Sequence, residues 1–412
     1  MKVAHLIPEW PAHSQVWFWR EICCLRQLGL DVTIFSTRRP RAQDRARHAF
    51  AEPGEKETIY LWPLAWWTLA WVTLLGMVRQ PMGFMRCLGL AFSLDLERRP
   101  RWAGALGVLG LLGPACYLAR QIRRRGIDHI HCHSAAQCTI LCMMARQLCG
   151  TPFSVIVNAN LDWWGGAMRK KLGDAAFTLL VTHWMVRQME QMCPEIPHDR
   201  YFLGRVGVDV DKWTPPPGGR PERGDGELRI LSVGRLVASK GHDVLLRAVA
   251  LLRQSGQKVK LLIGGDGPER AALQELAGQL QLGDAVTFLG PLAEDAYLQR
   301  MHQADVFVLA SHAEPMGVVY MEAMATEIAT VGTNAGGVPE IIRDGCNGVL
   351  VPPGDAAALA KALARLATDA AWRRTLGRAA RQTILEEFDS RLWAAALYQR
   401  LTGKRKDDKM TR

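Results

Sequence analysis

Residues 228–310 alternate short, almost wholly apolar segments with longer segments in which apolar residues recur at helical spacing. This pattern predicts strands at 228–233, 259–263, 285–289 and 306–310, and helices at 243–253, 269–280 and 297–303. Strands that are apolar on both faces and joined by helices form a parallel sheet with helices on both sides. Ligands of such sheets bind beyond the carboxyl ends of the strands, so the chemistry is expected there.

The first half of the chain has a similar but less regular pattern, with strands predicted at 3–7, 32–35, 127–133 and 153–157. A chain of 412 residues exceeds what one hydrophobic core usually holds. We therefore expect two α/β domains, at residues 1–212 and 228–388. The segment 213–227 is rich in proline and glycine and is predicted to be a linker, and residues 389–412 to form a C-terminal helix and a basic tail.

Residues 61–118 are predicted to be a helical insertion, rich in tryptophan and interrupted by prolines. The apolar run at 64–78 is shorter than the roughly 20 residues that cross a bilayer. Two interpretations remain open. The helices could simply cover the first domain, or their tryptophans and flanking arginines could enter a membrane interface.

Composition narrows the choice of partners. The net charge of +11 favours an anionic partner, but there is no zinc-finger, RNA-recognition or helix-turn-helix signature, so we expect no nucleic acid. The 10 cysteines have neither a metal-ligand spacing nor a disulfide pattern. The N-terminus lacks the charged and long apolar regions of a signal peptide, which predicts a cytoplasmic protein.

A basic loop follows the predicted strand at 228–233. Arg235 and Lys240 stand five positions apart on a segment bounded by glycines that opens a helix. Two cations together with the N–H groups of a helix start suit a diphosphate. The next strand ends at Gly264 and Gly265, where the lack of side chains lets a ligand approach the backbone.

Two carboxylates follow the predicted strand at 306–310. Glu314 lies on the loop and Glu322 eight positions further along the next helix, so both could reach one ligand over the helix start. The N–H groups of Gly317, Val318 and Val319 point to the same place. Glutamates in an apolar helix need hydrogen-bonding partners, and sugar and ribose hydroxyls would supply them.

The second half resembles the donor domain of glycosyltransferase family four, which is marked by a G-R-L-x-x-x-K-G loop and two glutamates separated by seven residues. The resemblance implies a GT-B fold, with two Rossmann-like doubly wound domains facing each other across a cleft. It also implies that Arg235 and Lys240 hold a diphosphate, that Glu314 contacts the donor sugar and that Glu322 holds the ribose. The base would lie near residues 288–290, with Gly265 and Gly290 beside the donor.

The first half is similar to the opening of the exopolysaccharide and colanic-acid type of this family, S-x-T-F-x-x-x-E, at residues 14–21, with Val16 in place of the Thr and Trp17 in place of the Phe. Ser14 and Gln15 stand where many members have a glycine pair near the donor phosphates. His131 and His133 match an H-x-H motif whose second histidine faces the sugar, which implies a catalytic role for His133. Asp162 is the expected acceptor contact.

Together these features predict a retaining hexosyltransferase that uses a UDP- or GDP-sugar and a glycan or lipid-linked acceptor in surface polysaccharide assembly. The predicted catalytic residues are Arg235, Lys240, Glu314 and His133. No Asp-x-Asp motif lies near the donor loops, so we expect neither a metal nor a cofactor. The alternative is a catalytically silent protein that binds nucleotide sugars. Contact with the inner face of the cell membrane would follow from a lipid-linked acceptor.

Overall fold

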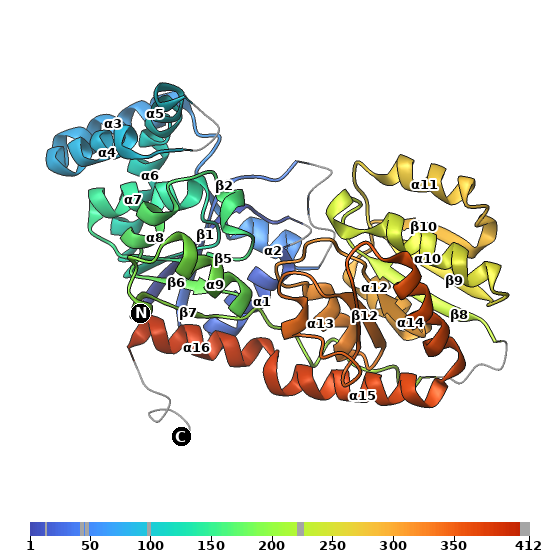
Figure 1. The fold of residues 1–412 in the computed structure, drawn as a ribbon. Coiled ribbons are helices and arrows are strands. Elements are labelled where there is room, and N and C mark those ends of the chain that lie inside the picture. The colour runs from blue at the N-terminus through green and yellow to red at the C-terminus, as the bar shows by residue number, and fades with distance from the viewer. Residues whose placement is uncertain (13–14, 42–44, 46–48, 97–99, 221–225, 404–412) are drawn as a thin grey trace, which may run out of the picture. The chain divides into compact units, whose positions relative to one another are not determined.

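The computed structural model describes residues 1–12, 15–41, 45, 49–96, 100–220 and 226–403 (Figure 1). The chain forms two compact units. The first contains Met1–Arg205 and the chain from Ala394 onward, and the second contains Val206–Trp393.

The first unit is built on a parallel sheet of seven strands in the order β3-β2-β1-β4-β5-β6-β7. Its strands are β1 (Lys2–Glu9), β2 (Asp31–Arg38), β3 (Ile59–Tyr60), β4 (His129–Cys132), β5 (Phe153–Val157), β6 (Phe177–Leu180) and β7 (Tyr201–Leu203). The strand order reverses between β1 and β4, as in doubly wound nucleotide-binding folds.

Helices connect these strands in the first unit. They are α1 (Val16–Gln27), α2 (Ala51–Lys56), α3 (Trp66–Arg79), α4 (Pro81–Ser93), α5 (Arg101–Leu109), α6 (Leu112–Arg125), α7 (Gln137–Cys149), α8 (Met168–Asp174) and α9 (His183–Met192). The last helix of the chain, α16 (Ser390–Thr402), belongs to this unit from Ala394 onward. Short 3-10 turns lie at Leu161–Trp164 and His198–Arg200.

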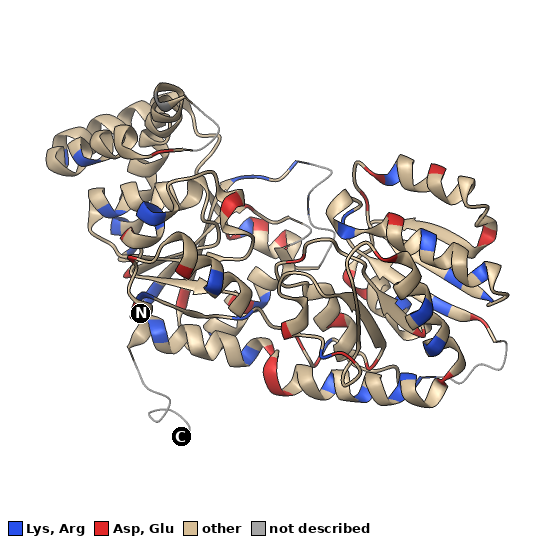
Figure 2. Cartoon of the chain, in the orientation of Figure 1, with Lys and Arg blue, Asp and Glu red and all other residues tan. Residues whose placement is uncertain are grey.

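The helical insertion consists of α3 to α6. Helix α3 packs on α6 and α4 packs on α7, so α6 and α7 separate α3, α4 and α5 from the sheet (Figure 1). Figure 2 shows few charged residues on α3 and α4. Within the described part of the chain, one helical stretch, Trp102–Arg125, has the length and mean hydropathy (1.5) of a membrane span, and 44% of that window is buried in the fold.

The second unit repeats the doubly wound plan with a parallel sheet of six strands in the order β10-β9-β8-β11-β12-β13. Its strands are β8 (Leu228–Val233), β9 (Val259–Gly264), β10 (Val286–Gly290), β11 (Val306–Val308), β12 (Ala329–Thr333) and β13 (Val349–Val351). Its helices are α10 (His242–Gln254), α11 (Arg270–Gln279), α12 (Glu294–Gln303), α13 (Val318–Ala325), α14 (Ala356–Thr368) and α15 (Ala370–Glu387). The prediction of two Rossmann-like parallel-sheet domains is therefore confirmed.

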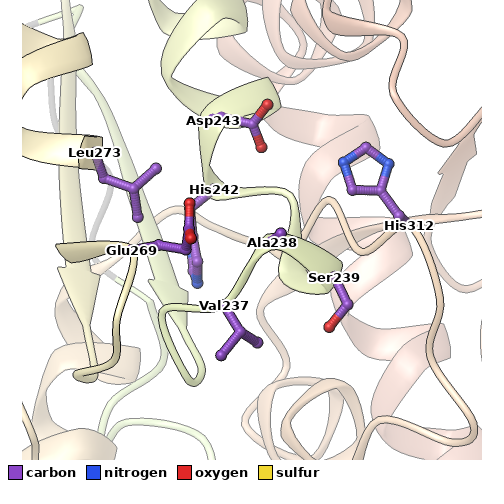
Figure 3. Close-up of a pocket in the computed structure, with 8 residues that line it drawn as sticks. All are labelled: Val237, Ala238, Ser239, His242, Asp243, Glu269, Leu273 and His312. Atoms are coloured by element: carbon purple, nitrogen blue, oxygen red, sulfur yellow. The ribbon is translucent and has the colours of Figure 1, made fainter. Parts of the chain in front are cut away.

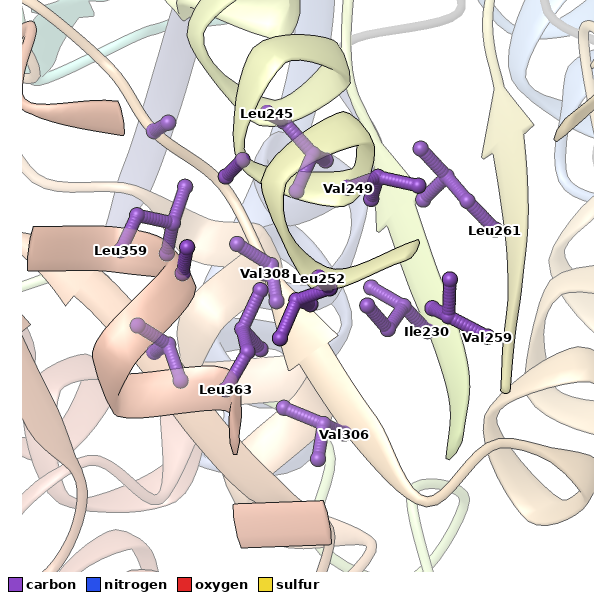
Figure 4. Close-up of a cluster of buried hydrophobic side chains, with 14 of the residues drawn as sticks. Ile230, Leu245, Val249, Leu252, Val259, Leu261, Val306, Val308, Leu359 and Leu363 are labelled. Atoms are coloured by element: carbon purple, nitrogen blue, oxygen red, sulfur yellow. The ribbon is translucent and has the colours of Figure 1, made fainter. Parts of the chain in front are cut away.

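The core of the second unit lies between this sheet and its helices. Figure 4 shows apolar side chains of α10, including Leu245 and Leu252, next to strand residues such as Ile230 and Val308. Burying an aliphatic side chain of this size stabilises the fold by about 1.5–3 kcal/mol.

The predicted linker differs from the structure at its first residues. Trp213 is fully buried, its ring contacts Tyr297, and Arg381 donates a hydrogen bond to its carbonyl oxygen. The guanidinium of Arg220 donates to the carbonyl oxygens of Met301, Ala304 and Thr326. Residues 213–220 thus pack on the second unit, whose boundary lies between Arg205 and Val206 rather than at 212.

Candidate functional site

The loops after β8 and β11 meet where the strand order of the second sheet reverses. The loop after β8 contains a 3-10 turn, Ala238–Lys240, and then Gly241, which has a φ of +63°. A Cβ atom at Gly241 would lie 1.9 Å from the carbonyl oxygen of Ala310. The backbone N–H of His312 also donates to the carbonyl oxygen of Ser239. Only glycine permits this approach, which fixes the two loops against each other.

The loops after β9 and β10 join the same edge of the sheet. Gly265 has a φ of +129°, and a Cβ atom there would lie 1.9 Å from the carbonyl oxygen of Gly234. The N–H of Gly265 donates to the carbonyl oxygen of Gly290 over 2.8 Å. The glycines predicted to lie beside a donor are therefore neighbours in space, and each is required by the backbone geometry or by close packing.

Lys240 and Glu314 form an ion pair in which the lysine Nζ donates to the carboxylate Oε2. Glu314 is 5% exposed, and its backbone carbonyl accepts from the N–H of Gly337. A Cβ atom at Gly336 would lie 2.2 Å from the same carbonyl oxygen. Since a buried carboxylate is costly without a partner, Lys240 stabilises Glu314 in the absence of a ligand.

Helix α13 begins directly beside this ion pair. Gly317 precedes the helix with a φ of +83°, and Val318 and Val319 are its first residues. The first N–H groups of a helix have no acceptor within the helix, so they can bind an anion. Glu322 lies one turn further along α13 and is 5% exposed.

Arg235 is on the same loop as Lys240 and is exposed, and no described residue forms an ion pair with its guanidinium. It therefore provides a positive charge that a ligand could bind. All the predicted donor residues gather at this one edge of the second sheet: Arg235, Lys240, Gly265, Gly290, Glu314, Gly317, Val318, Val319 and Glu322. Their roles toward a ligand stay predictions.

A cavity of about 450 Å³ lies beside the basic loop (Figure 3). Its lining comes from the loop, the starts of α10 and α11 and the segment after β11, and consists of Val237, Ala238, Ser239, His242, Asp243, Glu269, Leu273 and His312. Arg235, Glu314 and Glu322 are not part of this lining. We place the candidate site on the connected loops rather than in this cavity, because the ionic groups that could bind a diphosphate lie on the loops.

His242, the first residue of α10, is a buried group that the sequence pattern did not indicate. Its Nδ1 lies 3.4 Å from the hydroxyl of Ser232. Burial, with a smaller effect of the Lys240 charge, lowers the pKa of His242 from 6.5 to about 4. The residue is therefore neutral at physiological pH and adds no positive charge to the site.

The sequence pattern also missed the loop after β12. Gly336 and Gly337 hold the backbone of Glu314, as described above. Tyr320 on α13 donates a hydrogen bond from its hydroxyl to the carbonyl oxygen of Leu309, and burial raises its pKa. The mostly apolar segment 328–331, with a glycine pair five residues further along at 336–337, was a usable signal for this strand and loop.

The residues predicted for the first unit are less closely grouped. Ser14 lies outside the described residues. Gln15 precedes α1, and no described residue forms a hydrogen bond with its buried Oε1. Asp162 is exposed on the 3-10 turn Leu161–Trp164. Their contacts with a donor or an acceptor stay predictions.

His133 is buried in a cluster that the sequence pattern did not reveal. Its side chain has no exposed surface, and its Nε2 lies 2.8 Å from Nδ1 of His5. Glu21 and His131 complete the cluster. Burial lowers the pKa of His5 to about 3 and raises the pKa of Glu21 to about 8. Both ring nitrogens of His133 are buried in this structure, and its catalytic role stays a prediction.

Comparisons with known proteins agree with this geometry. Residues 220–383 match the model of the family described as "Glycosyl transferases group 1". Over 299 residues the chain is 37% identical to N-acetyl-alpha-D-glucosaminyl L-malate synthase of Bacillus anthracis, a match that covers 68% of this chain and 75% of that protein. It is 35% identical over 187 residues to the putative colanic acid biosynthesis glycosyltransferase WcaL of Escherichia coli strain K12, covering 44% of this chain and 45% of that one.

Among solved structures, HepE of Anabaena in complex with UDP and glucose is similar to this fold, with a TM-score of 0.72 at 17% identity. The similarity covers 98% of this chain and 100% of HepE. Two further curated relatives, glycogen synthase of Mycobacterium tuberculosis and a GDP-mannose-dependent mannosyltransferase of Mycolicibacterium smegmatis, are matched over 58% and 55% of their own length.

Proposed function

Because the chain belongs to the glycosyl transferases group 1 family, we propose that it transfers a hexosyl unit from a nucleoside-diphosphate sugar to an acceptor hydroxyl, with retention at the anomeric carbon. The observation that carries the proposal is the Lys240–Glu314 ion pair where the strand order of the second sheet reverses. This is the position at which doubly wound sheets bind nucleotides. Retention follows from the family resemblance.

The diphosphate is assigned to Arg235, Lys240 and the start of α13. The two side chains supply positive charge, and the N–H groups of Val318 and Val319 supply donors at a helix start. When the bond to the sugar breaks, negative charge develops on the departing diphosphate. Fixed cations and N–H groups stabilise that charge, so protein groups rather than a metal ion would stabilise the departing diphosphate.

The two buried glutamates are assigned to hydroxyl groups. Glu314 accepts hydrogen bonds from the donor sugar, and Glu322 accepts them from the ribose. Both residues are 5% exposed, and hydroxyl groups of a bound donor are suitable hydrogen-bond donors to buried carboxylates. Gly265 and Gly290 leave room for the nucleoside beside residues 288–290.

The donor is proposed to be a UDP- or GDP-sugar. The complex of HepE with UDP and glucose supports UDP as the first nucleotide to test. The 35% identity with the putative colanic acid glycosyltransferase WcaL supports assignment to the exopolysaccharide type of the family. The acceptor is then a glycan or a lipid-linked saccharide in surface polysaccharide assembly.

A lipid-linked acceptor also agrees with the surface of the helical insertion. Trp66, Trp67 and Trp71 on α3 are each more than half exposed, as are Phe92 on α4 and Trp102 on α5. Aromatic rings of this kind favour the interface between lipid and water. A cavity of about 230 Å³ between α3 and α6 is lined by Arg79, Arg120, Arg123 and Arg124, which suit anionic headgroups. We place the protein at the inner face of the cell membrane.

The membrane contact is tested by flotation of the full-length protein with vesicles containing anionic lipid. The wild-type chain is expected to float with the vesicles, and the double variant Trp66→Ser and Trp67→Ser to remain in the bottom fraction of the gradient. Leu251→Ser is a matched control, since Leu251 is an exposed apolar residue of the second unit. Equal flotation of all three proteins would show that the tryptophans of α3 do not contribute to membrane binding.

The donor site is tested by thermal unfolding in the presence of UDP, GDP, ADP and their sugars. A ligand at about 100 times its dissociation constant adds about 2.7 kcal/mol of stability. Protection by one nucleotide is expected to be lost in Glu322→Ala and kept in Glu386→Ala, a control on the exposed side of α15. The absence of protection by any nucleotide would overturn the donor site.

Turnover distinguishes the enzyme from a catalytically silent binding protein. The donor that protects the fold is incubated with the protein and a lipid extract, and the sugar is followed into lipid. Transfer supports the proposed enzyme. Protection with slow hydrolysis and no transfer would instead favour a protein that only binds nucleotide sugars.

A further inference from the structure

Trp163 is an exposed tryptophan that lies outside the helical insertion. Its exposed fraction is 55%, and every other described tryptophan that is more than half exposed lies between residues 62 and 102. Trp163 is on the 3-10 turn Leu161–Trp164, in the loop that follows β5. Strand β5 pairs with β4, which His133 follows, so this loop lies at the carboxyl edge of the first sheet. Doubly wound sheets bind their ligands at that edge.

The residues around Trp163 are held in place by the rest of the first unit. Leu161 is 1% exposed, and its N–H donates to a glutamine side chain of α9 over 3.4 Å. Nε1 of Trp164 donates to the carbonyl oxygen of Ala159 over 3.2 Å. Lys171 is 1% exposed, and its Nζ donates to the carbonyl oxygen of Trp164 over 2.8 Å. The loop is therefore fixed on both sides of Trp163, whose own ring is left in solvent.

The backbone after this turn has an unusual conformation. Gly165, Gly166 and Ala167 have φ values of +76°, +79° and +54°. This left-handed region is unfavourable for alanine. A Cβ atom at Gly165 would meet nothing within 4 Å, so the path of the chain rather than close packing favours glycine there. Unfavourable backbone conformations that a fold maintains are frequent at binding sites.

Polar acceptors accompany the exposed indole. Asp162 is the neighbour of Trp163 in the chain and is also exposed. Asn160 accepts the backbone N–H of Trp163 with its carbonyl oxygen, while its side-chain Oδ1 is buried and has no hydrogen-bond partner among the described residues. An indole beside such acceptors suits a ligand with a flat apolar face and hydroxyl groups at its rim. A pyranose ring has both, since its faces carry C–H bonds and its edge carries hydroxyls.

We propose that Trp163 is the surface on which a pyranose ring of the glycan acceptor stacks, and that the carboxylate of Asp162 accepts hydrogen bonds from the hydroxyls of that ring. The inference rests on the proposed function, because it concerns the acceptor of that transfer, and it names the residue that recognises the saccharide part. Trp163 takes no part in bond breaking and determines specificity. The exposed tryptophans then have two tasks: those of α3 contact lipid, and Trp163 contacts saccharide.

The first test needs no turnover and is therefore independent of the proposed function. Saturation-transfer NMR is recorded on the full-length protein with the methyl glycosides of glucose, galactose, mannose and N-acetylglucosamine. We expect the wild type to saturate the ring protons of at least one glycoside, and Trp163→Ala to bind it about 10-fold more weakly. Trp163→Tyr keeps a flat ring and should bind almost as the wild type does. Equal saturation by the wild type and Trp163→Ala, or none by either, would overturn the proposal.

The second test is transfer from the protecting donor to a lipid extract dispersed in detergent, so that binding to vesicles does not limit the rate. Trp163→Ala should raise the KM for the extract about 10-fold at a similar kcat. Trp62→Ala is the matched control, since Trp62 is 53% exposed and outside this loop, and it should change neither constant. Nucleotide protection and slow hydrolysis of the donor should be equal in all three proteins.

The outcomes of this second test separate the two proposals. An unchanged KM in Trp163→Ala, with normal transfer by the wild type, would exclude Trp163 from acceptor binding and leave the proposed function intact. If the wild type transfers no sugar, the proposed function fails, and the NMR result alone decides whether Trp163 binds a saccharide.

Vesicle flotation distinguishes a saccharide contact from one more membrane contact. Trp163→Ala should float as the wild type does, in contrast to the double variant of Trp66 and Trp67. Loss of flotation in Trp163→Ala, together with unchanged NMR saturation, would place Trp163 in the membrane contact and overturn the proposal.

Discussion

Lys240 and Glu314 form an ion pair between the loops that follow β8 and β11, the two strands at which the order of the second sheet reverses. The side chains are 17% and 6% exposed, so each neutralises a charge that is mostly removed from water. In the proposed function, Lys240 binds the diphosphate and Glu314 accepts hydrogen bonds from the donor sugar when a donor is bound. The ion pair thus keeps both charges in place until a donor arrives.

Lys240→Ala is expected to lower kcat/KM for the donor by about 100-fold, because it removes one fixed charge that stabilises the departing diphosphate. The measurement is initial-rate kinetics with the sugar nucleotide that protects the protein. Lys258→Ala provides a matched control, since Lys258 is exposed just before β9, at the opposite end of the strands. Unchanged turnover in Lys240→Ala would exclude this lysine from catalysis.

Gly241→Ala is expected to destabilise the second unit more than Gly345→Ala does. Both glycines have a positive φ, +63° and +70°, so an alanine costs each about 1 kcal/mol from the backbone conformation alone. At Gly241 the added Cβ would also lie 1.9 Å from the carbonyl oxygen of Ala310, whereas nothing lies within 4 Å at Gly345. Moving that backbone adds about 1–3 kcal/mol.

The comparison is made by urea unfolding of both variants, followed by circular dichroism. Gly241→Ala should also weaken nucleotide protection, since the same displacement moves Lys240. Equal midpoints for the two variants would mean that the loops after β8 and β11 are not held together as the structure describes.

The sheet of the second unit could be predicted from the sequence because its determinants are local. The strand at 228–233 is predicted with the same bounds that β8 has in the structure. An apolar run bounded by polar residues needs no knowledge of distant segments. Arg235, Lys240 and Glu314 could be placed together for the same reason, since the carboxyl ends of parallel strands share one edge.

Residues that depend on distant partners could not be predicted in this way. His5 and Glu21 become a cluster only when β4 aligns beside β1, 126 positions further along the chain at His131. Trp213 occurs in a stretch rich in proline and glycine that is typical of a linker, but its ring packs against Tyr297 in the second unit. The requirement for glycine at position 336 comes from the backbone of Glu314, which is distant in sequence and whose carbonyl oxygen would contact an added Cβ atom.

His242 should make the stability of the protein sensitive to acid. Its pKa is near 4 in the folded state and near 6.5 in the unfolded chain, so between these values the unfolded chain binds the extra proton. The contribution is complete above pH 6.5 and is lost as the pH falls towards 4, by about 3 kcal/mol in total. His242→Gln should therefore lose less stability than the wild type between pH 6.5 and 4.

The measurement is urea unfolding at a series of pH values within this range. Other buried histidines contribute to the wild-type curve, so the informative quantity is the difference between variant and wild type. His312→Gln is the control for removing an exposed imidazole from the neighbouring loop. Parallel curves for His242→Gln and the wild type would contradict a neutral, buried His242.

Trp213→Ala tests whether residues 213–220 are part of the second unit. The side chain is fully buried, and truncating a buried tryptophan costs about 3–5 kcal/mol. The expected result is a clear drop in the unfolding midpoint of the second unit, measured by calorimetry with and without the protecting nucleotide. Trp163→Ala, at a tryptophan that is 55% exposed, should change stability by less than about 0.5 kcal/mol. If residue 213 lay in a free linker, the two substitutions would have equally small effects, because neither would leave a cavity.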